Sequence, residues 1–195
     1  MPVTGRLRVR PGPGTPSGYL ILNQKLLIPE WCVVLLVGPS GAGKSTFARQ
    51  HFTSTEVLSS DYFRSLVSDD ENEQSATQDA FDLLYLVAQK RLLRKKLCLI
   101  DATNLRPEDR RGFVDLARES GCSCAAIVLN LPLEAHLERT GLRTDRQISR
   151  AVVKAQFAEF RNNLDTLHAE GFRPVYVLET PEQVGRVEIV RTPSI

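Results

Sequence analysis

Residues 38–45 read Gly-Pro-Ser-Gly-Ala-Gly-Lys-Ser and fit the pattern G-x-x-x-x-G-K-S/T. In this pattern the glycines let backbone N–H groups turn toward phosphate oxygens, the lysine reaches the β- and γ-phosphates, and the last hydroxyl ligates Mg²⁺. The pattern lies between an apolar stretch and a helix-like stretch, which is the context that phosphate binding needs. We therefore expect a nucleoside triphosphate, which we take as ATP, and Mg²⁺ at this loop, held by Gly38, Ser40, Gly41, Ala42, Gly43, Lys44, Ser45 and Thr46.

Two aspartates follow apolar stretches and are candidates for the chemistry of phosphate transfer. Asp61 comes shortly after residues 56–59, and Asp101 ends the run 97–100. Because the carboxyl ends of parallel strands line one crevice, we expect both carboxylates beside the phosphate-binding loop. We assign Asp61 as the base that accepts the proton of an attacking hydroxyl, and Asp101, with Ser45, as a metal ligand. The sequence also permits the two aspartates to exchange roles.

Polar side chains near these aspartates are candidates for binding the acceptor. Arg64 follows Asp61 by one helical turn, so it either pairs with that carboxylate or binds an acceptor phosphate bidentately. Thr103 and Asn104 either hydrogen-bond the acceptor or cap a helix that begins near Pro107. We therefore place the acceptor beside Asp61, Arg64, Thr103 and Asn104.

Four arginines recur at spacings of four, three and four, namely Arg139, Arg143, Arg146 and Arg150. On a helix they share one face, and Gly141 and Asp145 indicate a break, so we expect residues 133–168 to form a mobile helical lid. Lid arginines close on the transferring phosphoryl group and stabilise its charge, and we assign Arg139 and Arg143 to catalysis and Arg146 to ATP. A solvated basic face is the competing interpretation, which we favour for Arg150.

These residues need a framework of alternating strands and helices. Short apolar runs predict buried strands at residues 33–37, 56–59, 97–100, 125–129 and 175–178. Helices are expected between them, at residues 44–52, 62–68, 75–95, 107–119, 133–139 and 148–167. Ser75 and Gln78 are expected to form a capping box. The alternation predicts an α/β fold with an open parallel sheet of about five strands flanked by helices.

The ends of the chain differ from this pattern. Residues 1–18 are rich in Pro and Gly and are interpreted as a flexible tail. Residues 19–195 are interpreted as a single domain, with one or two short strands in residues 19–30. Residues 179–186 follow the last predicted strand and are candidates for holding the base of the nucleotide.

Composition excludes several classes of protein. The chain has 25 Lys and Arg against 23 Asp and Glu, a net charge of +2, so any nucleic-acid contact must be a local patch. The four cysteines match no metal-binding spacing and are expected to be small buried hydrophobes, which fits a reducing compartment. No apolar run approaches the ~20 residues of a membrane span, and the first residues lack a secretory signal. We expect a cytoplasmic protein without a membrane partner.

Several segments together resemble the kinase domain of bacterial polynucleotide kinase-phosphatase-ligase, an RNA-repair enzyme. The matching segments are GPSGAGKST at 38–46, EVLSSDYFR at 56–64, LVSDDENEQ at 66–74, LIDATN at 99–104, RTDRQ at 143–147 and GFRPVYVL at 171–178. The resemblance covers roughly residues 26–190 and implies a P-loop phosphotransferase with a lid. It places the family's general base at Asp61, its acceptor-phosphate arginine at Arg64, and its lid arginines at Arg139, Arg143 and Arg146.

The resemblance implies ATP- and Mg²⁺-dependent transfer of the γ-phosphate to the 5′-hydroxyl end of RNA or DNA. The family protein continues into phosphatase and ligase modules, so separate phosphatase and ligase proteins are candidate partners here. A kinase of a sugar or nucleoside and a non-catalytic nucleotide-binding switch are the alternatives. A polynucleotide kinase predicts an open, basic channel leading to Asp61. A small-molecule kinase predicts a closed acceptor pocket, and a switch predicts no base near the γ-phosphate.

Overall fold

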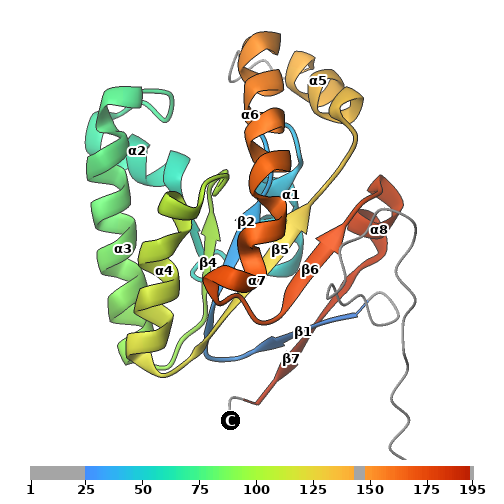
Figure 1. Ribbon diagram of the computed structural model, residues 1–195. Helices are drawn as coiled ribbons and strands as arrows, with labels where there is room; N and C mark the ends of the chain where they lie inside the picture. Colours follow the sequence, from blue (N-terminus) through green and yellow to red (C-terminus); the bar gives the residue numbers. More distant parts are fainter. Residues whose placement is uncertain (1–24, 143–147, 194–195) are drawn as a thin grey trace, which may run out of the picture.

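The computed structural model describes residues 25–142 and 148–193, and Figure 1 shows how they are arranged. A central sheet of five parallel strands has the order β3-β4-β2-β5-β6. Its strands are β2 (Cys32–Val37), β3 (Val57–Ser59), β4 (Cys98–Asp101), β5 (Ser123–Leu129) and β6 (Val175–Leu178). Because β2 has β4 on one side and β5 on the other, the strand order reverses at β2. A crevice for ligands opens at the carboxyl ends of the strands at such a point.

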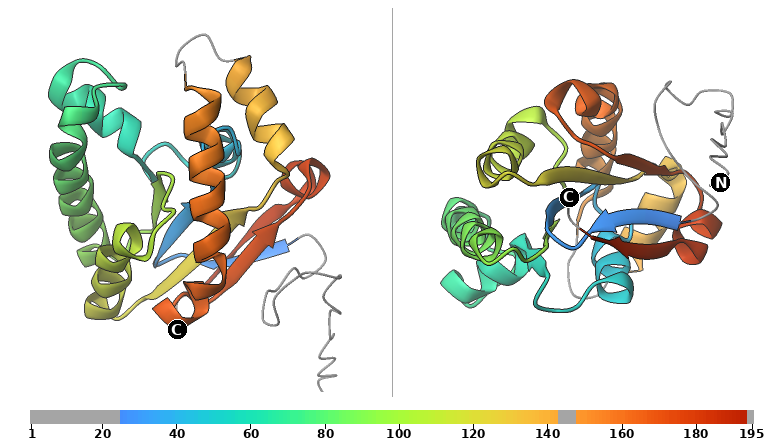
Figure 2. Two further views of the ribbon diagram at one scale, coloured as in Figure 1. Left: turned by 45° about the horizontal axis from the view of Figure 1, so that its top comes forward. Right: turned by 90° about the horizontal axis from the view of Figure 1, so that it is seen from below.

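Helices cover both faces of the central sheet (Figures 1 and 2). They are α1 (Lys44–His51), α2 (Ser60–Ser68), α3 (Thr77–Leu93), α4 (Pro107–Ser120), α5 (Leu133–Gly141), α6 (Arg150–Asn163), α7 (Leu167–Glu170) and α8 (Pro181–Arg186). Alternate residues of β2 point to opposite faces: Val33 and Leu35 pack in the cluster with α3, α4 and α6, and Val34 and Leu36 pack in the cluster with α1. Burial on both faces explains why the strands read as continuous apolar runs.

A second sheet joins two distant segments of the chain. Strand β1 (Lys25–Pro29) pairs in parallel with β7 (Glu188–Thr192). Leu26 and Ile28 are fully buried in the same cluster as α1. Tyr176 of β6 anchors this small sheet, because its hydroxyl accepts a hydrogen bond from the Leu27 N–H (3.0 Å) and donates one to the Leu27 carbonyl (2.9 Å).

The predicted α/β fold with a parallel sheet of five strands is confirmed. Helix α4 begins at Pro107 and ends at Ser120, where Gly121 in a left-handed conformation caps it. Strand β6 is not the last strand, however, because β7 follows α8. The proposed tail at residues 1–18, and residues 19–24 after it, lie outside the described residues.

One local prediction is wrong. Ser75 and Gln78 form no capping box, because Glu73 accepts a hydrogen bond from the Ser75 N–H (2.9 Å) and residues 74–76 form a 3-10 turn ahead of α3. The lid predicted at residues 133–168 stays a prediction. Its final third packs in the core through Phe160, Leu164 and Leu167.

The cysteines fit their predicted role. All four are free thiols, and Cys32, Cys98 and Cys124 are buried. Burial raises the pKa of Cys32 to about 12 and that of Cys98 to about 11, so both thiols are inert. Among the described residues no group of three or more His, Cys, Asp and Glu side chains is placed to hold a metal ion. No helix in the described part of the chain is long and apolar enough to cross a membrane.

Candidate active site

The loop between β2 and α1 has a shape that only glycine permits at two positions. Gly41 and Gly43 have left-handed φ angles of 79° and 91°. A Cβ atom on Gly41 would lie 2.6 Å from the carbonyl oxygen of His136, so no larger residue fits there. Helix α1 begins directly after this loop, and the N–H groups of its first turn have no partners within the helix. Loop and helix together form a cradle for phosphate oxygens.

Lys44 turns back over this loop. Its Nζ donates to the carbonyl oxygens of Gly38 (2.7 Å) and Pro39 (2.9 Å), and the residue is buried. The ammonium is thereby held at the cradle as a compact point charge suited to phosphate. The structure places all eight predicted ATP-binding residues of the segment 38–46 in this loop and the first turn of α1.

Arg139 contacts the loop from α5. Its Nη1 donates to the carbonyl oxygen of Ala42 (3.0 Å), which places one predicted lid arginine beside the cradle. Arg150 is exposed at the first position of α6, in agreement with a solvated side chain. Arg143 and Arg146 lie outside the described residues, so their predicted roles stay predictions.

Two residues that belong to none of the predicted motifs also hold the loop. Gln156 of α6 accepts a hydrogen bond from the Ser40 N–H through its side-chain oxygen (2.9 Å). His136 of α5 is fully buried, with one ring nitrogen 3.3 Å from the Ser40 carbonyl oxygen and the other 3.2 Å from that of Leu131. Burial lowers the pKa of His136, which favours the neutral ring. No sequence pattern marks either residue, because their partners are backbone groups of a distant loop.

Asp101 lies beside the start of α1, where a metal ligand is expected. The residue is buried at the end of β4, and the Ser45 side chain hydrogen-bonds its carboxylate. Burial raises the pKa of Asp101 above its ordinary value, while Lys44, the Ser45 hydrogen bond and Arg49 oppose the rise. A carboxylate and a hydroxyl oxygen side by side are hard oxygen donors of the kind that Mg²⁺ prefers. The residues present therefore fit a Mg²⁺ ion shared with the phosphates of a nucleotide.

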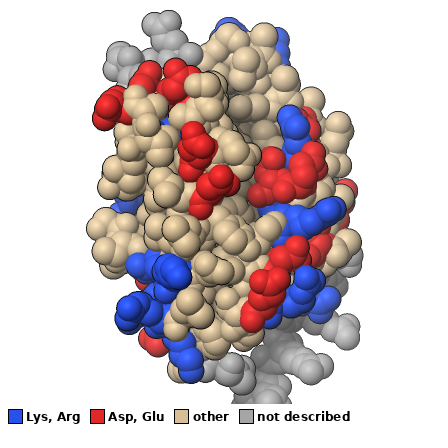
Figure 3. Space-filling view, turned by 90° about the vertical axis from the view of Figure 1, so that its left-hand side faces the viewer, with Lys and Arg blue, Asp and Glu red and all other residues tan. Residues whose placement is uncertain are grey.

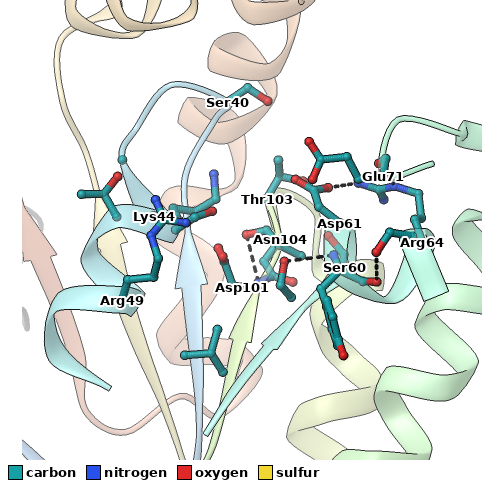
Figure 4. Close-up of a pocket in the computed structure, with 18 of the residues that line it drawn as sticks. Ser40, Lys44, Arg49, Ser60, Asp61, Arg64, Glu71, Asp101, Thr103 and Asn104 are labelled. Carbon is teal, nitrogen blue, oxygen red and sulfur yellow. Dashed lines mark hydrogen bonds and ion pairs between the residues drawn. The ribbon is translucent and has the colours of Figure 1, made fainter. Parts of the chain in front are cut away.

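Asp61 lies in the first turn of α2, directly after β3. Its Oδ1 is ion-paired with Nη2 of Arg64, whose Nε donates to the Glu71 carbonyl oxygen (2.8 Å). The Arg64 side chain is 6% exposed and that of Asp61 is 31% exposed. In Figure 4 Asp61 lies between Arg64 and the side of the pocket that bears Lys44 and Asp101. The described geometry therefore favours the pairing interpretation of Arg64.

Asn104 ties two strands together. The residue is 1% exposed in a left-handed conformation, and its Nδ2 donates to the Leu36 carbonyl oxygen (2.7 Å) at the end of β2. Its side chain does not cap α4, whose N-cap is Arg106, so the capping interpretation is wrong for this residue. Thr103 lines the pocket, and its carbonyl oxygen accepts a hydrogen bond from the Gly38 N–H (3.1 Å).

A pocket of about 1270 Å³ connects the loop, β3, α2 and the end of β4. This volume exceeds the ~300–1,000 Å³ of most ligand pockets, which leaves room for a nucleotide and an acceptor together. Residues 179–186 do not line it. Among the described lining residues, cations and carboxylates are equal in number. The cations are Lys44, Arg49, Arg64 and Arg139, and the carboxylates are Asp61, Glu71, Asp101 and Asp109.

Comparison with known proteins supports this architecture. A family model described as an AAA domain (AAA_33) matches residues 33–167. No curated protein matches the chain. A chain of the Pnkp1/Rnl/Hen1 RNA repair complex has a similar fold, with a TM-score of 0.62 and 20% identity over 71% of this chain and 47% of that chain. Chaetomium thermophilum Kti12 in complex with ADP-AlF3 matches with a TM-score of 0.60 and 17% identity over 80% of this chain and 94% of that chain.

A third similar structure, AvrRxo1-ORF1:-ORF2 with ATP, has a TM-score of 0.59 and 17% identity over 79% of this chain and 56% of that chain. The chain therefore spans about half the length of the RNA repair chain and of the AvrRxo1 chain. At identities this low the likeness shows the shared fold. The AAA_33 match, in contrast, covers most of the chain and includes the phosphate-binding loop, Asp61 and Asp101. The chain belongs to the AAA_33 family, as a P-loop domain of the kinase type.

Proposed function

We propose that this protein transfers the γ-phosphate of ATP, with Mg²⁺, to the 5′-hydroxyl end of RNA or DNA. The observation that carries the proposal is the shared pocket, in which Asp61 faces the side that bears Lys44 and Asp101 (Figure 4). A hydroxyl bound between them has a proton acceptor on one side and the phosphate cradle on the other. This is the arrangement that in-line transfer requires.

Different residues of the pocket bind the phosphates, accept the proton and stabilise the developing charge in this proposal. The N–H groups of the loop and the Lys44 ammonium bind the β- and γ-phosphates, and Asp61 accepts the proton of the attacking hydroxyl. Arg139 stabilises negative charge that develops on the transferred group. A Mg²⁺ ion held by Ser45 and Asp101 would neutralise phosphate charge. The proposal also assigns Arg143 to catalysis and Arg146 to ATP binding. Both residues lie outside the described residues.

Arg64 orients the base in this proposal. Its buried guanidinium is fixed by the Glu71 carbonyl and paired with Asp61, so it restrains the carboxylate toward the pocket. A contact between the same guanidinium and an acceptor phosphate stays a prediction, as do contacts from Thr103 and Asn104.

Two arguments support a polynucleotide as the acceptor. The motifs resemble those of a polynucleotide kinase, and one similar fold occurs in a Pnkp1/Rnl/Hen1 RNA repair complex. By the same reasoning we propose phosphatase and ligase partners for this chain. The site contains a base candidate at Asp61, which argues against a purely non-catalytic switch.

A kinase of a small molecule is the second candidate, and the charge balance of the pocket favours it. Four carboxylates offset four cations among the described lining residues, so this part of the pocket is not the uniformly basic channel that a polynucleotide kinase predicts. A neutral sugar or nucleoside fits such a site without electrostatic steering.

The deciding experiment incubates the protein with labelled ATP, Mg²⁺, 5′-hydroxyl RNA and DNA oligonucleotides, and a panel of sugars and nucleosides. We expect label on the oligonucleotides. Asp61→Asn keeps the size of the side chain but cannot take a proton, so kcat should fall by roughly 10²- to 10⁴-fold while the Kd for ATP stays within about twofold.

Asp69→Asn is the matched control. Asp69 is the exposed C-cap residue of α2 in a left-handed conformation that Asn accepts, so kcat should not change. Label only on a sugar or nucleoside would establish the second candidate, and ATP binding without transfer to any acceptor would establish a switch.

A further inference from the structure

The pocket offers two walls along which an acceptor can extend away from Asp61. The α1 wall consists of residues from the end of α1 to β3: Arg49, Phe52, Ser54, Thr55 and Val57. The α3 wall consists of residues around the start of α3: Glu71, Gln74, Thr77 and Phe81. We propose that the α1 wall receives the acceptor nucleotide and that Arg49 binds its phosphate. This inference rests on the function proposed above and names how the acceptor strand is held.

Among the described cations that line the pocket, Arg49 is the one without a hydrogen bond or ion pair. Lys44 donates to loop carbonyls, Arg64 is paired with Asp61, and Arg139 donates to the Ala42 carbonyl. The Arg49 side chain is exposed, and within residues 25–142 and 148–193 it has no hydrogen-bond or ion-pair partner. A guanidinium in this state can bind a phosphate bidentately without first breaking a contact.

The fold places Arg49 on the acceptor side of the pocket. Strands β3 and β4 lie on one side of β2, and β5 and β6 lie on the other. The α1 wall leads into β3, and Asp61 follows β3 directly, so both belong to the same half of the pocket. Arg139 approaches the loop from α5, which follows β5 in the other half. In Figure 4 Arg49 and Arg64 lie on opposite sides of Asp101, so their guanidinium groups belong to different parts of the pocket.

The remaining residues of the α1 wall suit a nucleotide. Ser54 and Thr55 are exposed and offer hydroxyl groups to phosphate or sugar oxygens. Val57 is partly exposed and gives the wall an apolar surface for a sugar or base, while Phe52 is buried behind it. The wall itself contains no carboxylate, and the neighbouring Glu56 is ion-paired with Arg191 of β7 (2.8 Å), which compensates its charge.

The α3 wall suits a phosphate less well. Glu71 lies in it, in a loop that also carries Asp69, Asp70 and Glu73. Figure 3 faces α2 and α3, and carboxylates gather over the upper part of this face. An anionic strand would meet like charges along this path. The charge distribution therefore directs the strand toward Arg49.

The test compares Arg49→Ala and Arg49→Lys with Arg111→Ala, a control at an exposed arginine of α4 that does not line the pocket. We expect Arg49→Ala to lower kcat/KM for a 5′-hydroxyl oligonucleotide by roughly 10- to 100-fold, and to lower its ratio to kcat/KM for a nucleoside by a similar factor. Lysine should restore the activity in part, because an ammonium lacks the planar fork. The slope of log kcat/KM against log salt concentration should become shallower by about 0.7, the value for one phosphate of a single strand.

Direct binding provides a readout that does not depend on turnover. Fluorescence anisotropy with a labelled 5′-hydroxyl oligonucleotide and no ATP should give a Kd about 10-fold higher for Arg49→Ala than for Arg111→Ala. Equal losses on oligonucleotide and nucleoside, or a higher Mg²⁺ requirement as the sole effect, would overturn the phosphate contact and assign Arg49 to Asp101 instead. If wild-type protein phosphorylates oligonucleotides and Arg49→Ala behaves like the control, the Arg49 assignment alone fails. If wild-type protein neither binds nor phosphorylates them, the proposed function fails with it.

Discussion

Asp101 is buried at the end of β4, where its negative charge disfavours the folded chain. Burial raises its pKa above the ordinary 3.8 despite Lys44, Ser45 and Arg49 nearby. A carboxyl group with a higher pKa in the folded state binds its proton more tightly there, so folding stability falls as pH rises through that range. At pH values above that range the penalty is present in full. We therefore expect Asp101→Asn to raise the Tm of the nucleotide-free protein at such pH values.

Calorimetry at two pH values checks the cause. The gain in Tm should disappear below pH 3.8, where the wild-type carboxyl is protonated too. In kinetic assays the same variant should need about 10-fold or more Mg²⁺ for half-maximal transfer, since a metal ligand is lost. A lower Tm at pH 7 together with an unchanged Mg²⁺ requirement would show that Asp101 is a structural residue.

How far single residues can be predicted from sequence depends on whether their partners are local. Lys44 could be placed because its motif, its strand and its helix adjoin in the chain. The choice between pairing and ligand contact for Arg64 stayed open, because burial decides it and burial depends on the tertiary fold. Arg49 carries one usable signal, its place four residues after Ser45 on the same helix face. Gln156 carries none, because its partner lies 116 residues away in the chain.

At the scale of elements, a buried arginine joins the loop after β4 to the last turns of the α6–α7 segment. Arg110 of α4 is 1% exposed and donates to the carbonyl oxygens of Asn104 and Leu105 (3.0 Å each). It also forms an ion pair with Glu170 and a hydrogen bond to Thr166 (3.2 Å). The arginine thereby fixes the loop that carries Asn104 against α7.

Removal of this arginine should destabilise the protein strongly. Arg110→Ala removes the cationic partner of the partly buried Glu170 and leaves two buried carbonyl groups without this donor, which should lower the free energy of unfolding by about 3–5 kcal/mol in urea denaturation. Arg118→Ala on the same helix is the control. The pair formed by Arg118 with Asp115 has an arginine side chain 73% exposed, so its loss should change stability by about 0.5 kcal/mol or less. Similar losses for both variants would contradict the importance of the buried network.

Strand prediction succeeded in the central sheet and at β1, which lies within the predicted segment 19–30, and failed at β7. The strands of the central sheet are apolar at nearly every position, which the sequence displays directly. Strand β7 reads Glu-Ile-Val-Arg-Thr and is partly exposed throughout, so its residues give no apolar run. It forms a strand because β1 offers a parallel partner, and that pairing is a property of the tertiary fold.

At the scale of the whole molecule, one hydroxyl group connects the central sheet to the small sheet. Tyr176 of β6 satisfies both backbone groups of Leu27 in β1. Tyr176→Phe keeps the ring but removes both hydrogen bonds, so we expect a loss of about 1–3 kcal/mol in the free energy of unfolding. Chemical denaturation measures the loss, and hydrogen exchange should show faster exchange of the Leu27 amide than in the wild type. If the Leu27 exchange rate in Tyr176→Phe equals that of the wild type, pairing with β7 is sufficient to keep β1 in place without the Tyr176 hydroxyl.

The pairing of β1 with β7 also means that the small sheet can form only late in synthesis of the chain. The two strands lie about 160 residues apart in the chain, so β1 emerges from the ribosome long before its partner. At ~5–20 residues per second this interval lasts roughly 8–30 s. During that time β1 has an unpaired edge and two apolar side chains, Leu26 and Ile28, that are fully buried only in the finished protein. The nascent chain therefore passes through a period in which its first strand is prone to aggregation or chaperone binding. This period ends only when β7 has left the exit tunnel.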